Sequence, residues 1–492
     1  MTIFIQLLRE TCAAPPASAA GRPPRPKYLT IADAIETAAA RGLLQPGVAL
    51  PTHREVADVL GVTVGTVTRG YAEAARRGLV RGETGRGTFP LSQKEGFARI
   101  GRRAEDTADF LREAGTLHEP HDAEAHPLQQ QSQNGFSRVD MGLNTPFHAL
   151  DPDLGEALGQ LAARGNLQPL LHYHQPRGLL RHREAGVHWA ALHGYRAEPD
   201  NVLVCAGAQH GMAVTLSALF APGDRIAVES LTYPLIKPLA KRLRLQLVPV
   251  AMDAQGMLPE AFAAACVQDN VRGLYIMPGC QNPTLAHMPE YRRHEMAALC
   301  RRHGVRIIED DMYALTLETV LPPISALAPE LGCFIASTSK ALTGGLRTAF
   351  VCAPPDCVRR LESAIESTIW MSAPLMAELA VLWLQNGTAA RVLHTKRAEA
   401  AARNAMTRDI LGAWNYSGRP SGYYIWLRLP KRWRSVEFSE AAAQRGVSVA
   451  HMEHFAVGSA QPEQGVRVSL CGPRDRQNLR TGLEVLADLL SL

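Results

Sequence analysis

The sequence predicts two domains of unequal size: a small helical domain that ends in a hairpin, and a large α/β domain built on a mainly parallel sheet. Residues 28–90 carry three helix patterns in succession, followed by two short strand patterns around a glycine-rich tip. Residues 91–139 lack hydrophobic periodicity, which is typical of a linker. Between residues 140 and 492, apolar runs alternate with helix patterns, as in a sheet with crossover helices.

Composition limits the class of protein. Hydrophobic residues make up 46% of the 492 residues and charged residues 20%, which excludes a disordered chain. Residues 21–89 hold ten Lys and Arg against six acids, so they carry +4 of the net charge of +5. A basic segment on a nearly neutral body favours nucleic-acid binding. Nine cysteines without a CxxC pair, no basic leader and no apolar run of membrane-spanning length lead us to expect a cytoplasmic protein.

The small domain shows end signals for each of its helices. Residues 1–27 are rich in Ala and Pro, and we expect a flexible extension there. Thr30 is expected to cap the first helix, Thr52-x-x-Glu55 forms a capping box for the second, and Thr63 starts the third. Gly61 and Gly78 are expected to end the second and third helices. On the third helix, Val64, Val67, Tyr71 and Ala74 share one face, whereas Thr66, Arg69 and Gly70 lie on the others.

The short connection around Gly61 has the spacing of a helix-turn-helix, and LVRGETGRGTFP predicts a β-wing with Arg86 at its tip. A helix in the major groove needs short polar side chains and an arginine on its outward face, as Thr66 and Arg69 provide. Arg54, which begins the second helix, and Arg86 could meet phosphate or the minor groove. An ordinary three-helix bundle with a hairpin would show the same pattern.

Residues 28–90 resemble the winged helix-turn-helix of the GntR regulators. The stretch GLLQPGVALPTHREVADVLGVTVGTVTRGYAEAARRGLVRGETGRGTF carries the resemblance over the whole small domain. It implies binding to double-stranded DNA through Arg54, Thr66, Arg69 and Arg86. Tyr71 is expected to pack in the core.

Seven apolar runs predict the strands of the large sheet: NVLVCAG, DRIAVES, LQLVPVA, GLYIMPG, VRIIEDD, GCFIAST and TAFVCAP. Polar residues follow several of these runs. Ala208-Gln209 opens a helix after a glycine turn, Tyr233 and Asn282 follow strands, and three acids at Glu309–Asp311 end one. Each feature has a structural explanation, such as core packing or turn capping. Metal binding is a rival for the acids, but no histidine lies beside them at ligand spacing, so we expect no metal site.

The stretch STSKALTGGLR carries the most specific chemistry. Lys340 can form an imine with an aldehyde, while Ser337, Ser339 and Arg347 can bind a phosphate. A surface lysine in a polar loop is the alternative. Together with an acid for a pyridinium nitrogen and an aromatic ring for stacking, these groups suit pyridoxal 5′-phosphate.

Residues 140–492 resemble the fold-type I aminotransferases, most clearly in QNPT, EDDMY and STSKALTGGLR. The resemblance implies a smaller C-terminal subdomain, a homodimer, and Lys340 as the catalytic lysine that holds pyridoxal 5′-phosphate as an internal aldimine. It also implies an effector carboxylate at Arg467. The other cofactor contacts that it implies are Asp310, Asn282, Tyr313, Tyr233, Ala208, Gln209, Ser337, Ser339, Arg347 and Tyr173, the last reaching the phosphate of the partner subunit. Two departures are Leu285, where the related motif NPTG has glycine, and Asp311, which stands beside Asp310.

The domain arrangement is similar to that of the MocR family, which joins a GntR winged helix, a linker and an aminotransferase-like domain in one chain. This resemblance implies a transcriptional regulator that senses an amine or amino acid as an external aldimine. An active aminotransferase with a vestigial or autoregulatory head is the alternative, and a repressor that responds to pyridoxal phosphate itself is a third.

Overall fold

The computed structural model describes residues 5–6, 8, 26–40, 43–44, 48–77, 79–83, 87–90, 139–165, 167–458 and 463–492. They belong to two compact units, one within residues 1–123 and the other within 124–492. The predicted linker up to residue 138, Gly78 and Arg86 lie outside the described residues. No helix in the described ranges has the length and apolar character needed to cross a membrane.

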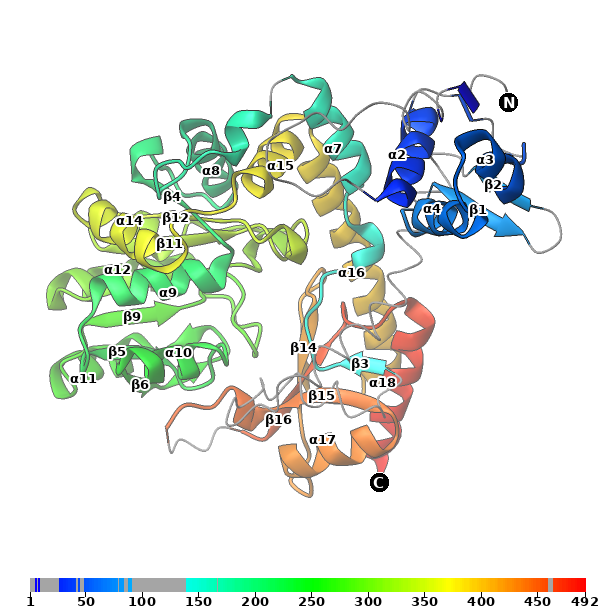
Figure 1. The fold of residues 1–492 in the computed structure, drawn as a ribbon. Helices are drawn as coiled ribbons and strands as arrows, with labels where there is room; N and C mark the ends of the chain where they lie inside the picture. Colours follow the sequence, from blue (N-terminus) through cyan, green and yellow to red (C-terminus); the bar gives the residue numbers. More distant parts are fainter. Residues whose placement is uncertain are drawn as a thin grey trace. The chain divides into compact units, whose positions relative to one another are not determined.

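The described part of the small unit includes helices and a hairpin (Figure 1). It includes α2 (Lys27–Ala40), α3 (His53–Leu60) and α4 (Val64–Arg76), and β1 (Val80–Glu83) pairs antiparallel with β2 (Gly87–Pro90). The capping box of α3 is confirmed, since Thr52 accepts from the Glu55 N–H and Glu55 accepts from the Thr52 N–H. Gly61 ends α3 with φ 59°, and Thr63 caps α4. The predicted winged helix-turn-helix is therefore present.

Three expectations for the small unit were wrong. The helix α2 begins at Lys27, so Thr30 lies inside its first turn and is not its cap. Gly70 is buried against α2: a Cβ there would lie 2.8 Å from Cγ2 of Ile31, so the two helices approach closely at this position. Val64 is 44% exposed because it precedes the stretch of α4 from Val67 to Ala74 that packs in the core.

The large sheet has seven strands in the order β4-β12-β11-β10-β9-β5-β6. They are β4 (Val202–Cys205), β5 (Arg225–Glu229), β6 (Gln246–Val250), β9 (Gly273–Ile276), β10 (Arg306–Asp310), β11 (Gly332–Ser337) and β12 (Ala349–Cys352). All seven predicted runs form these strands. Because β12 is antiparallel to β4 and to β11, β4 runs parallel to the remaining five strands.

Helices cover both faces of this sheet. Alternate residues of β10 enter different cores: Ile308 packs with α9 (Ala208–Leu219), α10 (Ile236–Leu243) and α14 (Pro355–Ile369), and Ile307 packs with α11 (Pro259–Gln268) and α12 (Glu290–His303). Likewise Phe334 of β11 enters a core with α8 (Leu180–Leu192) and α15 (Pro374–Gln385). The result is a three-layer α/β/α subdomain. Three smaller elements of the unit are α7 (Leu154–Ala163), α13 (Ile324–Leu327) and the hairpin β7 (Met252–Asp253) with β8 (Gly256–Met257).

A second, smaller subdomain contains a five-stranded sheet in the order β13-β14-β16-β15-β3. Its strands are β13 (Tyr416–Ser417), β14 (Tyr424–Arg428), β16 (Gly465–Ser469), β15 (Val447–His451) and β3 (Val139–Met141). Helices α17 (Ser435–Gln444) and α18 (Arg476–Ser491) pack on it. The 24-residue helix α16 (Thr388–Leu411) joins the two subdomains, packing on α15 and on α18 (Figure 1).

Removing the α3 cap should loosen the small unit locally. Thr52→Ala eliminates the side-chain acceptor of the capping box, and we expect a loss of about 1 kcal/mol of local stability. Hydrogen exchange of the α3 amides in the full-length protein should then be roughly fivefold less protected. Thr30→Ala is the matched control, since Thr30 caps nothing; equal loss of α3 protection in both variants would contradict the assigned cap.

Candidate cofactor and effector site

The predicted site residues lie at one edge of the large sheet. Gln209 follows β4, Tyr233 follows β5, Asn282 follows β9, Asp310 ends β10 and Lys340 follows β11. These five strands run in the same direction, so their carboxyl ends share an edge. Open α/β sheets bind their ligands at this edge.

Lys340 lies in a partly buried, polar position. Its Nζ donates to the backbone carbonyl of Asn144 at 2.5 Å and lies 5.6 Å from the ring centre of Tyr313. Burial, helped by the guanidinium groups of Arg467 and Arg347, lowers the pKa of the Lys340 ammonium to about 8. The Asp310 carboxylate opposes this change. About a tenth of Nζ is therefore neutral and nucleophilic at pH 7, and about half at pH 8.

The two adjacent acids at the end of β10 have different surroundings. Asp310 accepts a hydrogen bond from the Tyr275 hydroxyl at 3.1 Å, and its other oxygen, Oδ1, is buried without a partner in the described structure. Burial raises the pKa of Asp310 to about 6. Asp311 lies against Gly279, where a Cβ would be 2.1 Å from its Oδ2. Asp310, which interacts electrostatically with Lys340, is thus the acid that belongs to the lysine's surroundings.

The N-terminus of α9 forms a cup for an anion. Gly207 precedes the helix with φ 86°, and a Cβ there would lie 2.3 Å from Nη2 of Arg347. Only glycine lets the guanidinium approach this closely. Arg347 also reaches Oγ of Ser339 at 3.5 Å, and the Ser339 N–H donates to Oγ of Ser337 at 3.2 Å. The positive guanidinium of Arg347 therefore lies close to the partly positive N–H groups at the N-terminus of α9. A bound phosphate would stabilise both.

Arg467 connects the two subdomains. It is buried on β16, its Nη1 donates to Oδ1 of Asn282 at 2.9 Å, and its Nη2 donates to the carbonyl of Gly142 at 2.7 Å. Its Nε is buried and has no partner among the described residues. A buried guanidinium without an acid beside it is suited to a carboxylate ligand.

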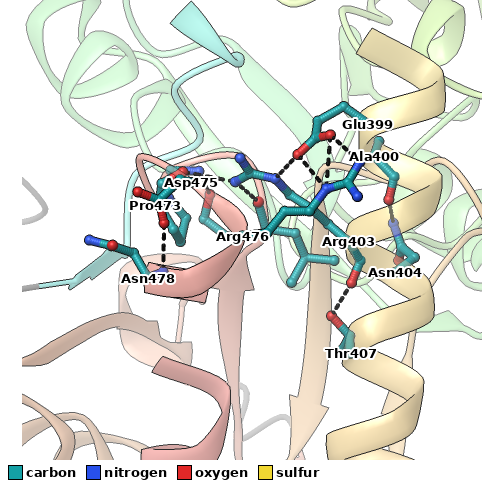
Figure 2. A network of polar contacts seen from close by, with 12 residues as sticks. Glu399, Ala400, Arg403, Asn404, Thr407, Pro473, Asp475, Arg476 and Asn478 are labelled. Carbon is teal, nitrogen blue, oxygen red and sulfur yellow. Dashed lines mark hydrogen bonds and ion pairs between the residues drawn. The ribbon is translucent and has the colours of Figure 1, made fainter. Parts of the chain in front are cut away.

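A network on α16 fixes the end of the strand that carries Arg467. Figure 2 shows Arg403 and Arg476 converging on Glu399, at 2.8 Å and 2.6 Å. Nη1 of Arg403 also donates to the carbonyls of Leu470 at 2.9 Å and Pro473 at 2.8 Å. The segment after β16 is therefore held against α16, which limits where Arg467 can lie.

A second buried contact of α16 supports the loop after Lys340. Lys396 is fully buried, and its Nζ lies 2.7 Å from Oδ1 of Asp151 and donates to the carbonyl of Leu342. Thr343 donates to the other oxygen of Asp151 at 3.0 Å. The lysine loop is thus tied to the same helix as the segment after β16.

The remaining predicted residues are placed as follows. Tyr313 is buried and its hydroxyl accepts from the Asn144 amide at 3.1 Å. Burial raises the pKa of Tyr233, which interacts electrostatically with Asp310, Arg467 and Arg347. Tyr173 is 82% exposed and packs edge-on against Trp370, with 5.8 Å between ring centres. Within one chain, Tyr173 makes no hydrogen bond to the other described site residues.

In the small unit, Arg54 and Arg69 are exposed and Thr66 is partly buried at the start of α4. The Thr66 hydroxyl lies 2.9 Å from that of Thr63. Tyr71 is buried and donates to the carbonyl of Pro51 at 2.8 Å, in agreement with the core role expected for it.

The donor set fits pyridoxal phosphate. The oxygens Asp310 Oδ1 and Gln209 Oε1 are buried without partners in the described part of the chain, and unsatisfied buried polar atoms are costly unless a ligand pairs with them. An anion cup, a partly neutral lysine and an acid that can accept from a pyridinium stand on neighbouring loops of one edge.

Sequence reasoning missed several supporting residues. Asn144 bonds both Lys340 and Tyr313, Tyr275 orients Asp310, and Asp151 pairs with Lys396. In the sequence, Tyr275 lies 35 positions from Asp310, Asn144 lies 169 positions from Tyr313, and Asp151 lies 245 positions from Lys396. The polar Tyr275 inside an apolar strand is the one local signal that could have been noticed.

The lowered pKa of Lys340 has a direct test. Because the neutral amine is the reactive form, its fraction rises with pH, and acetylation of Lys340 by acetic anhydride in the cofactor-free protein should show a midpoint near pH 8. An unperturbed lysine has a pKa of about 10.4. Peptide mass spectrometry measures the labelling, with exposed Lys241 in the same digest as the internal reference. A midpoint above pH 10 would contradict the assigned surroundings.

Two family models match the chain. Residues 27–89 match the bacterial regulatory proteins of the gntR family, and residues 139–486 match the aminotransferase class I and II family. The chain is 30% identical to the HTH-type transcriptional regulator YdeF of Bacillus subtilis, covering 95% of each protein. It is 26% identical to the HTH-type pyridoxine biosynthesis transcriptional regulator PdxR of Corynebacterium glutamicum, covering 95% of this chain and 96% of that protein.

Solved structures share the fold of the large unit. The kynurenine aminotransferase of Pyrococcus horikoshii superposes with a TM-score of 0.68 at 21% identity, over 76% of this chain and 95% of that one. The α-aminoadipate aminotransferase LysN of Thermus thermophilus gives 0.66 at 22% identity, over 75% and 95%. Both proteins are aminotransferases of the pyridoxal phosphate class. The chain therefore belongs to the gntR and the aminotransferase class I and II families, and is a helix-turn-helix transcriptional regulator of the MocR type whose cofactor is pyridoxal phosphate.

Proposed function

We propose that this regulator senses an amine or an amino acid at the pyridoxal phosphate site of its large domain. The observation that carries the proposal is the environment of Lys340, whose Nζ has a pKa lowered to about 8 and lies beside a buried, partly unsatisfied Asp310. When bound, the cofactor would supply an electrophilic aldehyde carbon. Lys340 would hold the cofactor there through Nζ, and an effector amine would compete with Nζ for the same carbon.

We propose the following cofactor contacts, which the positions of the loops support. Asp310 would accept from the pyridine nitrogen, with Tyr275 keeping its carboxylate in place. Asn282 and Tyr313 would meet the phenolic oxygen, and Tyr233 would lie on the ring. The phosphate would be bound by Ala208, Gln209, Ser337, Ser339 and Arg347.

The effector signal is proposed to pass through Arg467. This arginine lies on the small subdomain, and its Nη1 already bonds Asn282 of the large subdomain. An effector carboxylate on Arg467 would compete for that contact, so occupancy changes how the two subdomains are joined. That change would then reach the DNA-binding domain through the segment between the domains.

We further propose a homodimer in which Tyr173 contacts the phosphate bound to the partner. Tyr173 is 82% exposed beside Trp370, which is 51% exposed, and such an aromatic pair is typical of a protein interface. The proposed division is an extension at 1–27, the DNA-binding domain at 28–90, a linker at 91–139 and the effector domain at 140–492. The matched family ranges support it. We place the protein in the cytoplasm, where DNA and free amines meet.

Lys340→Ala should abolish the amine response. The variant loses the only side chain proposed to hold the aldehyde carbon but keeps Ser339, Arg347 and Asp310, so it should bind the cofactor reversibly and more weakly. Titration of the wild type with an amine panel should shift the cofactor absorption band, and the variant should lose effector-dependent transcription while keeping DNA binding. Borohydride reduction of the wild type followed by peptide mapping should place the adduct on Lys340; an adduct on another lysine contradicts the proposal.

The same panel separates a sensor from an aminotransferase. One relative, the 2-aminoadipate transaminase of Thermus thermophilus, is 26% identical over 61% of this chain and 79% of that protein. A sensor should convert at most about one equivalent of amino acid per site. Steady production of keto acid would favour the enzyme, and a transcriptional response to pyridoxal phosphate without any amine would favour the third alternative.

Arg69→Ala should weaken operator binding and relax sequence preference. Arg69 is exposed on α4, and loss of one base-contacting arginine costs roughly 1–3 kcal/mol. Fluorescence anisotropy with an operator obtained by in vitro selection measures the effect. Arg302→Ala, at an exposed arginine of the large unit, controls for the loss of one positive charge. Unchanged affinity and preference in Arg69→Ala would mean that α4 does not read DNA through this side chain.

A further inference from the structure

A cavity of about 760 Å³ lies between the two subdomains of the large unit. The large subdomain lines it with the ends of β5 and β6, the β7–β8 turn and residues 284–286, and the small subdomain lines it with β13, β14 and the turn after β13. Its lining includes neither Lys340 nor Asp310 nor Arg467. It is therefore separate from the site proposed for the cofactor and the effector, and its size suits a small molecule.

The charged groups around this cavity leave one positive charge in excess among the described residues. Both lining acids have an arginine of their own: Asp253 is bound by Arg292 at 2.7 Å and 3.0 Å, and Glu463 is bound by Arg428 at 2.9 Å. Arg419 also lines the cavity, is partly buried, and donates its Nε to the carbonyl of Leu285 at 3.3 Å. It has no carboxylate partner in the described ranges, so its guanidinium edge can receive an anion.

Most of the uncharged lining residues are apolar or aromatic. The small subdomain contributes the partly buried Tyr416 and the large subdomain contributes Pro249 and Met252, whereas Trp426 and Leu231 expose only 2% and 5% of their surface. The strand register places Trp426 opposite Arg467, so the cavity begins one strand away from the effector site. A flat or apolar body between these walls would bury area, while its charged end meets Arg419.

We propose that this cavity binds a second ligand, a small monocarboxylate with an apolar or aromatic body, whose carboxylate pairs with Arg419. The ligand needs no amino group, because the cavity lining does not include Lys340, where an amine would meet the cofactor. It therefore differs in chemistry from the amine that the cofactor site takes.

The cavity is connected to the effector site through residues 281–286. Leu285 adopts a left-handed backbone with φ 57°, a conformation that leucine avoids, and a Cβ on Gly422 of the small subdomain would lie 3.1 Å from its Cδ2. Its carbonyl is held by Arg419, and three residues earlier Asn282 bonds Arg467. A carboxylate on Arg419 thus acts on the loop that carries Asn282. This coupling rests on the proposed function, whereas the binding itself does not.

Isothermal titration of the cofactor-loaded, full-length protein with 3-phenylpropanoate tests the site, because this probe has a carboxylate and a phenyl ring but no amine. Wild type should bind it, and Arg419→Gln should weaken binding at least tenfold. Arg302→Gln, at an exposed arginine elsewhere, should bind like wild type. The uncharged 3-phenylpropanamide should bind at least tenfold more weakly than the carboxylate.

A second variant guards against misfolding. Ala254→Trp narrows the cavity from the exposed β7–β8 turn and leaves Arg419 in place, so it should also weaken binding while retaining the wild-type circular dichroism and cofactor absorbance. Arg467→Gln should keep binding within a few-fold. The proposal is overturned if wild type shows no binding at 10 mM probe, if Arg419→Gln binds normally, or if Arg467→Gln rather than Arg419→Gln abolishes binding. None of these results depends on whether amines alter the cofactor.

Discussion

The common direction of β4, β5, β9, β10 and β11 is the constraint on which the large unit depends. Because these strands end at one edge of the sheet, residues from five separate segments of the chain meet there. The helices on both faces bury these strands except at the first residues of β5 and β10, which fixes the strand ends within a close-packed frame. The loops beyond that edge can then carry charged and polar side chains at precise positions.

The site holds polar groups in an arrangement that would be unfavourable for stability alone. Arg347 lies against a helix N-terminus, Arg467 is buried without an acid, and Asp310 keeps one oxygen unpaired. Burying such groups without partners destabilises a fold, so their retention indicates a ligand that completes them. Burial lowers the pKa of both Lys396 and Lys340, but the Asp151 carboxylate pairs with Lys396 and opposes the change there, whereas Nζ of Lys340 donates to a backbone carbonyl.

Much of this architecture could be predicted from the sequence because the signals are local. Fully buried parallel strands appear as short apolar runs, and all seven were recognised; the caps at Thr52, Gly61 and Thr63 depend on residues within one turn. Supporting contacts could not be predicted, since Asn144 meets Lys340 from 196 positions away. The start of α2 was misjudged because Thr30 resembles a cap, whereas the helix begins three residues earlier, at Lys27.

The helix α16 holds two distant segments of the large unit at a fixed spacing. Lys396 ties it to the loop of Lys340, and Arg403, seven residues later, ties it to the segment that follows Arg467. Seven residues are about two turns, roughly 10.5 Å along the axis. The distance between these two ties is therefore set by backbone length. An inserted or deleted residue in α16 between them would rotate one tie by about 100° relative to the other, so the helix could no longer hold both segments in their present positions.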